Sequence, residues 1–238
     1  MKDLPKYPSL YQINTRVWLN EMSPILGRQA TLDDIPDSEL DRIASLGFDW
    51  IWMLSVWQTS KASRQVSLEN PDFRKSFEAT LPDLKDDDIA GSGFAIAAYK
   101  VTPVIGGEAA LKRFRARLQK RNLRLMLDFV PNHMGLDHSW LRDHANYFIQ
   151  GTESDFENSP QNYTKVKVQS GNDIFAYGRD PYFSGWPDTL QIDYSNPEAV
   201  AAMAKELISI SKKCDGVRCD MAMLILPEVF LRTWGRSS

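Results

Sequence analysis

The 238-residue chain is poor in cysteine and contains neither a long apolar run nor an excess of basic residues. Its two cysteines, Cys214 and Cys219, lie five positions apart, a spacing that suits neither a disulfide nor a metal site. The first six residues, MKDLPK, lack the apolar core of a signal peptide, and no apolar run reaches membrane-spanning length. We therefore expect a cytoplasmic protein with reduced thiols and no membrane partner.

Charge and motifs exclude further classes of function. Lys and Arg number 28 against 31 Asp and Glu, and the basic residues are scattered, so nucleic acid is not an expected partner. The sequence also has no phosphate-binding loop, nucleophile-elbow serine or dinucleotide fingerprint. The substrate is expected to be neutral or nearly so.

Apolar runs rich in β-branched and aromatic residues alternate with helix-like stretches, a pattern that predicts βα units around a parallel sheet. The predicted strands are residues 10–19, 48–54, 123–130 and 216–223. Three helices are predicted. The first begins near a cap at Asp37 and ends at Gly47, the second spans 107–121, and the third spans 196–213 with a cap at Asn196. The expected fold class is α/β.

Two segments, 55–105 and 131–193, are too long for plain connections inside a compact domain. The second is rich in Gly, Pro, Asn and aromatic residues, as in a small subdomain over a site. We expect both to be functional insertions.

Two predicted strands carry charged residues at their C-terminal ends. In GVRCD, Arg218 and Asp220 lie two positions apart and share one face if the stretch is a strand. An Arg neighbour keeps an Asp ionised and ready to act as a nucleophile, although a structural ion pair is the commoner role for such a pair. The run ending in DFVPNH brings Asp128 and His133 to the end of another strand.

These motifs resemble the alpha-amylase superfamily, glycoside hydrolase family 13. DFVPNH resembles the family's DxxxNH region, and GVRCD resembles its GxRxD region, in the family's order and at a similar separation. GWPDTLQID followed by Asn196-Pro197, and the early segment Tyr11-Gln12-Ile13, match further family segments. The resemblance covers nearly the whole chain but only the N-terminal half of the family's catalytic domain.

The resemblance implies a (β/α)8 TIM-barrel type of fold, truncated after about strand four, with an inserted subdomain after strand three. Residues 1–130 and 194–238 would then form a partial barrel, and residues 131–193 would form the inserted subdomain. The implied substrate is an alpha-glucan or a related oligosaccharide, and the implied reaction is hydrolysis or transfer of an alpha-glucosidic bond with retention.

Individual roles follow only from the resemblance. Asp220 matches the catalytic nucleophile and Arg218 the residue that orients and ionises it. Asp128 and His133 match groups that hold sugar hydroxyls, and Phe94 stands where many members carry a sugar-stacking Tyr. Asn132 matches a calcium-binding position of many members; we expect no other cofactor.

The family's acid/base Glu has no match in this chain. Glu228 lies too close to Asp220 and at a predicted helix start, so we reject it for that role. We accordingly expect a truncated, inactive form whose exposed barrel edges allow self-association. The alternative is a non-catalytic carbohydrate-binding or structural relic of the same fold.

Remaining aromatic and histidine residues receive structural interpretations. His138 and His144 flank Trp140 without a ligand set at zinc spacing. Most aromatic residues of the second insertion are expected to form its core. Trp50, Trp52 and Trp57 are likewise expected to lie in the core, and of the three only Trp57, at a strand's end, is placed to serve as a sugar platform instead.

Overall fold

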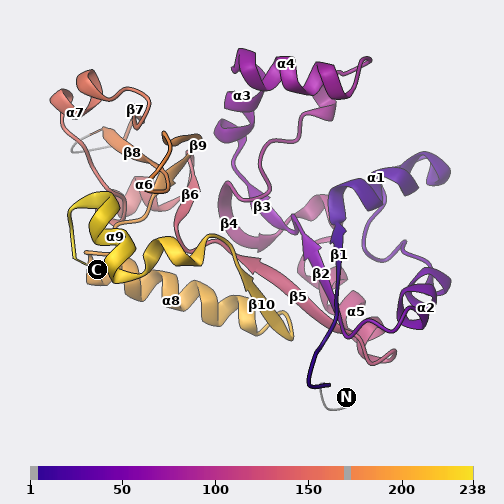
Figure 1. Ribbon diagram of the computed structural model, residues 1–238. Coiled ribbons are helices and arrows are strands. Elements are labelled where there is room, and N and C mark those ends of the chain that lie inside the picture. The colour runs from indigo at the N-terminus through magenta and orange to yellow at the C-terminus, as the bar shows by residue number, and fades with distance from the viewer. Residues whose placement is uncertain (1–4, 169–172, 238) are drawn as a thin grey trace. The chain divides into compact units, whose positions relative to one another are not determined.

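The computed structural model describes residues 5–168 and 173–237, and the fold divides into two compact units (Figure 1). Residues 1–4 and 238 of the predicted barrel part, and 169–172 of the predicted insertion, lie outside the described residues. In the part that is described, no helix is both long and apolar enough to cross a membrane.

The first unit comprises residues 1–58, 99–129 and 205–219 and is built on a parallel sheet of order β1-β2-β5-β10. Its strands are β1 (Leu10–Asn14), β2 (Trp50–Leu54), β5 (Arg124–Phe129) and β10 (Gly216–Cys219). Its helices are α1 (Thr15–Leu26), α2 (Asp37–Ser45), α5 (Gly107–Gln119) and the 3-10 turn η2 (Pro103–Ile105). The predicted α/β class is therefore confirmed. In the described residues the sheet has four strands and stays open.

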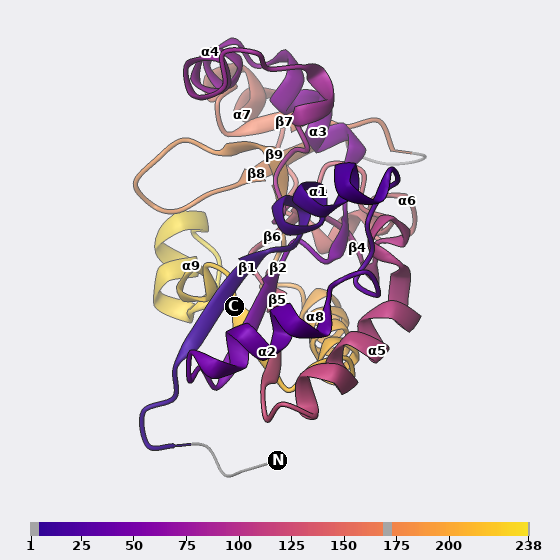
Figure 2. The ribbon, with the colours of Figure 1, turned by 90° about the vertical axis from the view of Figure 1, so that its right-hand side faces the viewer.

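Figure 2 shows β1, β2 and β5 of this sheet with α2 and α5 beside them. Alternation along the strands gives the sheet two unlike faces. One face is buried against helices and is aliphatic, with Ile51, Met53, Leu125 and Leu127 shielded from solvent. The register of the parallel strands places a different set on the other face. That set, called the charged face here, consists of Trp50, Trp52, Arg124, Met126, Asp128, Gly216 and Arg218.

Gly216 is required by packing on the charged face. A Cβ at this position would lie 2.5 Å from a ring carbon of Trp50. Arg124 lies over the same indole, with its guanidinium carbon 5.8 Å from the ring centroid. The glycine thus lets a large aromatic side chain approach the backbone of β10.

Two predicted strands are longer than the observed ones. The run 10–19 ends as a strand at Asn14, whose side-chain oxygen accepts the Val17 N–H and starts α1. The run 216–223 ends as a strand at Cys219; Met221 has φ +50°, and a 3-10 turn, η4 (Ala222–Ile225), follows. Both runs are apolar enough to imitate strands, but a cap and a left-handed residue stop them.

Helix α2 and the segment just before it are joined by three ion pairs to α5 and the segment just after it. Asp33, Asp37 and Asp41 recur every four residues and pair with Arg113, Arg117 and Arg121, which have the same spacing. Asp37 is the first residue of α2 rather than its cap, since Pro36 occupies the cap position.

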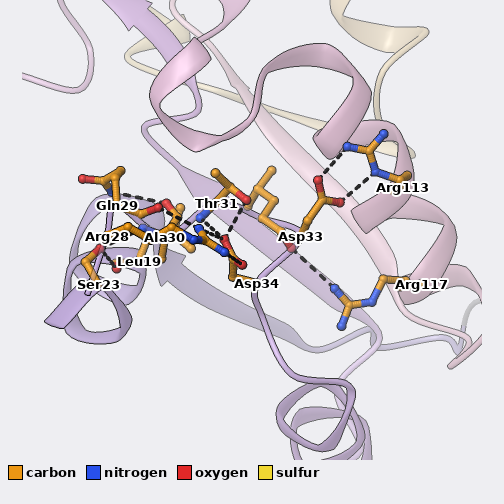
Figure 3. A network of polar contacts seen from close by, with 11 residues as sticks. Leu19, Ser23, Arg28, Gln29, Ala30, Thr31, Asp33, Asp34, Arg113 and Arg117 are labelled. Carbon is orange, nitrogen blue, oxygen red and sulfur yellow. Dashed lines mark hydrogen bonds and ion pairs between the residues drawn. The ribbon is translucent and has the colours of Figure 1, made fainter. Parts of the chain in front are cut away.

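The loop before α2 is held by the same helix α5 (Figure 3). Arg28 pairs with Asp34 at 2.6 Å, and Asp34 also accepts the backbone N–H of Thr31. Arg117 donates to the carbonyl of Leu32 in this loop. These exposed contacts fix geometry more than they stabilise, because solvent-exposed pairs contribute about 0.2–1 kcal/mol each.

Asp215 makes a largely buried ion pair in this unit. Its side chain is 6% exposed, and one oxygen receives Arg115 at 2.6 Å while the other accepts the N–H of Leu125. Burial acts to raise its pKa, but the Arg115 and Leu125 hydrogen bonds outweigh burial and hold the pKa below its ordinary value. The ion pair with Arg115 ties the turn before β10 to α5, and the hydrogen bond from Leu125 ties it to β5.

The second unit comprises residues 59–98, 130–204 and 220–238 and contains an antiparallel sheet of order β6-β9-β8-β7. Its strands are β6 (His133–Gly135), β7 (Tyr163–Lys165), β8 (Ile174–Gly178) and β9 (Trp186–Gln191). Its helices are α3 (Lys61–Glu69), α4 (Pro71–Thr80), η1 (Asp86–Asp88), α6 (Trp140–Asp143), η3 (Ala145–Tyr147), α7 (Glu153–Asn158), η4 and α9 (Pro227–Trp234). Three elements run from one unit into the other: β3 (Trp57–Thr59), its partner β4 (Ile96–Val101) and α8 (Pro197–Ser211).

The predicted cap of α8 is confirmed, because Asn196 Oδ1 accepts the Glu198 N–H at 2.9 Å just before Pro197. The described residues of the segment 131–193 lie inside the second unit, together with 59–98. The division into a partial barrel and an inserted subdomain stays a prediction.

Helix α9 is fastened to the second unit by its apolar face. Phe230 is fully buried with Ile149 and Ala176, and Trp234 packs against the same cluster. Arg179 lies 4.5 Å from the Trp234 ring centroid and donates to the Thr233 carbonyl. These contacts anchor the chain after η4.

We predict that Asp215→Asn lowers the free energy of unfolding by about 2 kcal/mol, because a charge-assisted and largely buried hydrogen-bond set is lost. Urea unfolding at pH 7 measures the loss. Asp33→Asn is the matched control, since its pair with Arg113 is exposed and its loss should stay under about 1 kcal/mol. Equal losses for the two variants would contradict the ranking.

Candidate functional site

The first unit brings Asp128 and Arg218 together. The parallel register of β5 and β10 pairs them directly, so both side chains lie on the charged face. Arg218 Nη1 is 3.3 Å from Asp128 Oδ1, and the two side chains are 32% and 4% exposed. A carboxylate this buried needs such a partner to remain charged.

Trp52 of β2 completes this group. Its indole Nε1 donates to Asp128 Oδ1 at 3.0 Å, and the Arg218 guanidinium carbon lies 4.8 Å from the Trp52 ring centroid. The ring therefore supports the cation while its N–H binds the anion. Sequence reasoning assigned Trp52 to the core; the available signal was its even spacing along β2, which places it on the charged face.

Trp57 lies in the core, as the sequence favoured, and is not the sugar platform that its place at a strand's end also allowed. Its side chain is 1% exposed, and its Nε1 donates to the backbone carbonyl of Asp128 at 2.9 Å. The ring packs edge-on against Tyr99 at 5.7 Å. Trp57 holds the C-terminal end of β5 in place and offers no open face.

Asp220 directly follows β10 and lies in the second unit, 6% exposed. The predicted strand 216–223, which would place Arg218 and Asp220 on one face, ends at Cys219, because the left-handed Met221 turns the backbone into η4. Cys219 itself is exposed, whereas Cys214 is buried, and both thiols are free.

His133 lies in β6 of the second unit, opposite Gln191 of β9. Its ring is 4% exposed and packs edge-on against Trp186 at 5.2 Å. Gly178 leaves space for it, since a Cβ there would lie 2.8 Å from the His133 Cβ. Burial lowers the pKa of His133 to about 4, so the imidazole is neutral at physiological pH.

Asn132 does not show the contacts of a calcium ligand. Its Oδ1 accepts an N–H from Gln191 at 3.0 Å, and its Nδ2 lies 3.4 Å from His133 Nδ1. Calcium requires six to eight oxygen ligands, and among the described residues no three acidic, His or Cys side chains gather as a metal site. Calcium at Asn132 therefore stays a prediction, and no step below uses the cation.

Phe94 is half-buried in the turn before β4, and its N–H donates to Ser92 Oγ. The second insertion's aromatic residues divide between core and surface: Phe175 is fully buried, whereas Tyr182 and Phe183 are more than 70% exposed. The core assignment is therefore wrong for the last two.

His138 has the predicted structural role. Its Nδ1 accepts the Trp140 N–H, and its ring packs edge-on against Trp140 at 4.7 Å. Burial lowers its pKa to about 4 against the opposing charge of Asp137. His144 stacks on Tyr147 at 4.7 Å.

The family follows from comparison with known proteins. A family model described as the catalytic domain of alpha amylase matches residues 31–232, which is most of the chain. The chain belongs to the alpha-amylase family. It is 24% identical over 231 residues to the alpha-glucosidase of Culex pipiens, covering 92% of this chain and 34% of that protein.

Two further similarities agree with membership of the alpha-amylase family. The amino acid transporter heavy chain SLC3A1 of Mus musculus is 23% identical over 207 residues, covering 82% of this chain and 26% of that protein. The crystal structure of an alpha-amylase from Lactobacillus plantarum superposes with a TM-score of 0.60 at 21% identity, covering 95% of this chain and 41% of that one. The α/β fold with its parallel sheet is thus that of alpha-amylase family enzymes. The chain spans 34% of the length of the alpha-glucosidase and 26% of the length of the transporter heavy chain.

Asp128 and Arg218 meet in one unit, whereas Asp220, Asn132, His133 and Phe94 belong to the other. The roles expected of them from the alpha-amylase family stay predictions, as does the expectation of calcium.

The buried histidines predict a pH dependence of stability. Between pH 6.5, the ordinary His pKa, and about 4, the unfolded chain binds a proton that the folded His133 refuses, so stability falls as the pH falls. The contribution of His133 alone makes the free energy of unfolding about 2 kcal/mol lower at pH 5 than at pH 7.

Urea unfolding gives the change in the free energy of unfolding between pH 7 and pH 5 for the wild type and for His133→Gln. The difference between these two changes is the contribution of His133. The difference isolates His133, because Asp188 and Glu206, whose pKa values burial raises, are present in both proteins. The variant should lose about 2 kcal/mol less on acidification; the same loss in both would refute the burial of a neutral His133.

Proposed function

We propose that this chain contributes to the catalytic centre of a retaining enzyme that hydrolyses or transfers alpha-glucosidic bonds in alpha-glucans or related oligosaccharides. The observation that supports it is the buried Asp128–Arg218 pair, held by Trp52 on the charged face of a chain of the alpha-amylase family. A buried and ionised carboxylate is a strong acceptor for sugar hydroxyls.

In this proposal Asp220 is the nucleophile. Its carboxylate attacks the anomeric carbon, the bond to the leaving oxygen breaks, and a covalent glycosyl intermediate forms, which water or a sugar hydroxyl then resolves. The positive charge of Arg218 favours the ionised form of neighbouring carboxyl groups. Asp128 and His133 bind sugar hydroxyls, and Phe94 offers an aromatic face to a sugar ring.

Retaining hydrolysis also needs an acid that protonates the leaving oxygen, about 5–5.5 Å from the nucleophile. Glu228 is exposed in the first turn of α9, as the sequence predicted, and is not proposed for this role. The acid is therefore not assigned to a residue of this chain, and the expected inactivity of the chain alone stays a prediction.

A non-catalytic role is the second candidate. The matched amino acid transporter heavy chains are named for a role other than sugar hydrolysis. In that case the same polar groups would bind a sugar, or merely support the fold, without breaking a bond.

Isothermal titration of the 238-residue chain with a maltooligosaccharide tests binding, and release of reducing sugar tests turnover. We expect binding, and we expect Asp128→Asn to weaken it about 10- to 100-fold, because a hydrogen bond to a charged group is lost. Asp33→Asn, an exposed carboxylate in the same unit, is the matched control and should bind as the wild type does.

Turnover that disappears in Asp220→Ala would support the catalytic proposal. Binding without turnover would agree with the expected inactivity of the chain alone and with the non-catalytic candidate alike, whereas turnover would contradict that inactivity. Absence of binding, or equal binding by wild type and Asp128→Asn, would overturn the proposed sugar site.

A further inference from the structure

A chain of buried amides leads from β9 to His133, and one of its atoms has no partner. Gln191 is fully buried, and its Oε1 accepts no hydrogen bond within the described residues. Its Nε2 makes two bonds instead, to Asn132 Oδ1 at 3.0 Å and to the Ile192 carbonyl at 3.2 Å. A buried polar atom left without a partner is costly, so the two bonds on the nitrogen must outweigh it.

The Ile192 carbonyl fixes which way the Gln191 amide points. A backbone carbonyl oxygen only accepts hydrogen bonds, so the side-chain atom that faces it must be the donor nitrogen. The same nitrogen then faces Asn132, whose amide must present its oxygen in return. Turning the Gln191 amide would place its oxygen against two oxygens.

The orientation of Asn132 in turn fixes the proton on His133. Because the Asn132 oxygen faces Gln191, its Nδ2–H group faces His133 Nδ1 at 3.4 Å. A neutral imidazole has one donor and one acceptor nitrogen, so Nδ1 must be the acceptor and Nε2 must carry the proton. The opposite tautomer would set two N–H groups against each other in a buried site.

We propose that Gln191 is a positioning residue that acts through Asn132 to hold His133 in the Nε2–H tautomer, so that the imidazole presents a hydrogen-bond donor to an acceptor oxygen of a neutral sugar. This inference rests on the proposed function for its ligand. Gln191 touches no substrate in this account; it sets the donor and acceptor identity of a residue that does.

Burial agrees with this arrangement. The pKa of His133 is lowered to about 4, so the doubly protonated ring, in which Nδ1 would also be a donor, is not populated at neutral pH. Gly178 and Trp186 confine the ring from two further directions, and the Asn132 amide is the group that faces its Nδ1.

Long-range 1H–15N NMR of the 15N-labelled full chain at pH 7 reads the tautomer directly. The chain has three histidines, so His133→Gln identifies the His133 signals. His138, whose Nδ1 accepts the Trp140 N–H, is an internal reference for the same tautomer. We expect His133 to be unprotonated at Nδ1 and protonated at Nε2, with the other tautomer under about a tenth. A wild-type His133 protonated at Nδ1 would overturn the proposal.

Two variants separate positioning from simple support of the fold. In Asn132→Asp the carboxylate accepts from both neighbours, so His133 Nδ1 should become protonated while His138 is unchanged. In Gln191→Met the Asn132 amide is free to turn, so both His133 tautomers should be populated. Gln161→Met replaces an exposed glutamine of the same unit and should change neither. Full retention of the Nε2–H tautomer in Gln191→Met would show that Gln191 does not position His133.

Titration of maltotriose into the same samples distinguishes this inference from the proposed function. We expect Gln191→Met to bind the sugar about tenfold more weakly than Gln161→Met. Tautomer shifts as predicted, with no sugar binding by any of the proteins, would overturn the sugar role and leave the positioning of His133 standing. Sugar binding with no tautomer change in either variant would overturn the positioning and leave the proposed function standing.

Discussion

The charged face of the parallel sheet depends on the carboxylate of Asp128. An ionised group that is 3% exposed would cost several kcal/mol if it lacked partners. Arg218 of β10 supplies the opposite charge and Trp52 of β2 a neutral donor, so one residue of β5 ties together the strands on both of its sides. The Trp57 indole holds the backbone carbonyl of the same residue.

The second unit handles buried polarity differently. Its interior near β6 and β9 contains amides and a neutral imidazole in place of an ion pair, and their orientations are linked through the hydrogen bonds of Gln191, Asn132 and His133. Such a chain supplies donors and acceptors of fixed identity without net charge. The paired carboxylate of the first unit and the oriented imidazole of the second are each suited to a neutral, hydroxyl-rich ligand.

Periodicity and motif spacing predicted the strands that carry Asp128 and Arg218, because these patterns are local, whereas the face that the two residues share comes from the parallel register of β5 and β10. Strand ends were less predictable: the run after Cys219 is apolar like a strand, and only the left-handed backbone of Met221 ends it. The hydrogen-bond partners of the tryptophan N–H groups could not be predicted from local sequence, since Trp52 and Trp57 donate to Asp128 across more than seventy residues. Likewise, nothing local distinguishes Gln191 from any other glutamine in a strand. Its role comes from the residue that β-pairing sets opposite.

A double-mutant cycle on Asp128→Asn and Arg218→Met, followed by urea unfolding at pH 7, tests the central claim most directly. Met keeps much of the apolar length over Trp52 while removing the charge. The account predicts a coupling free energy of about 1–3 kcal/mol between the two positions, as for residues of one buried network. Additive losses, within about 0.3–0.5 kcal/mol, would contradict it.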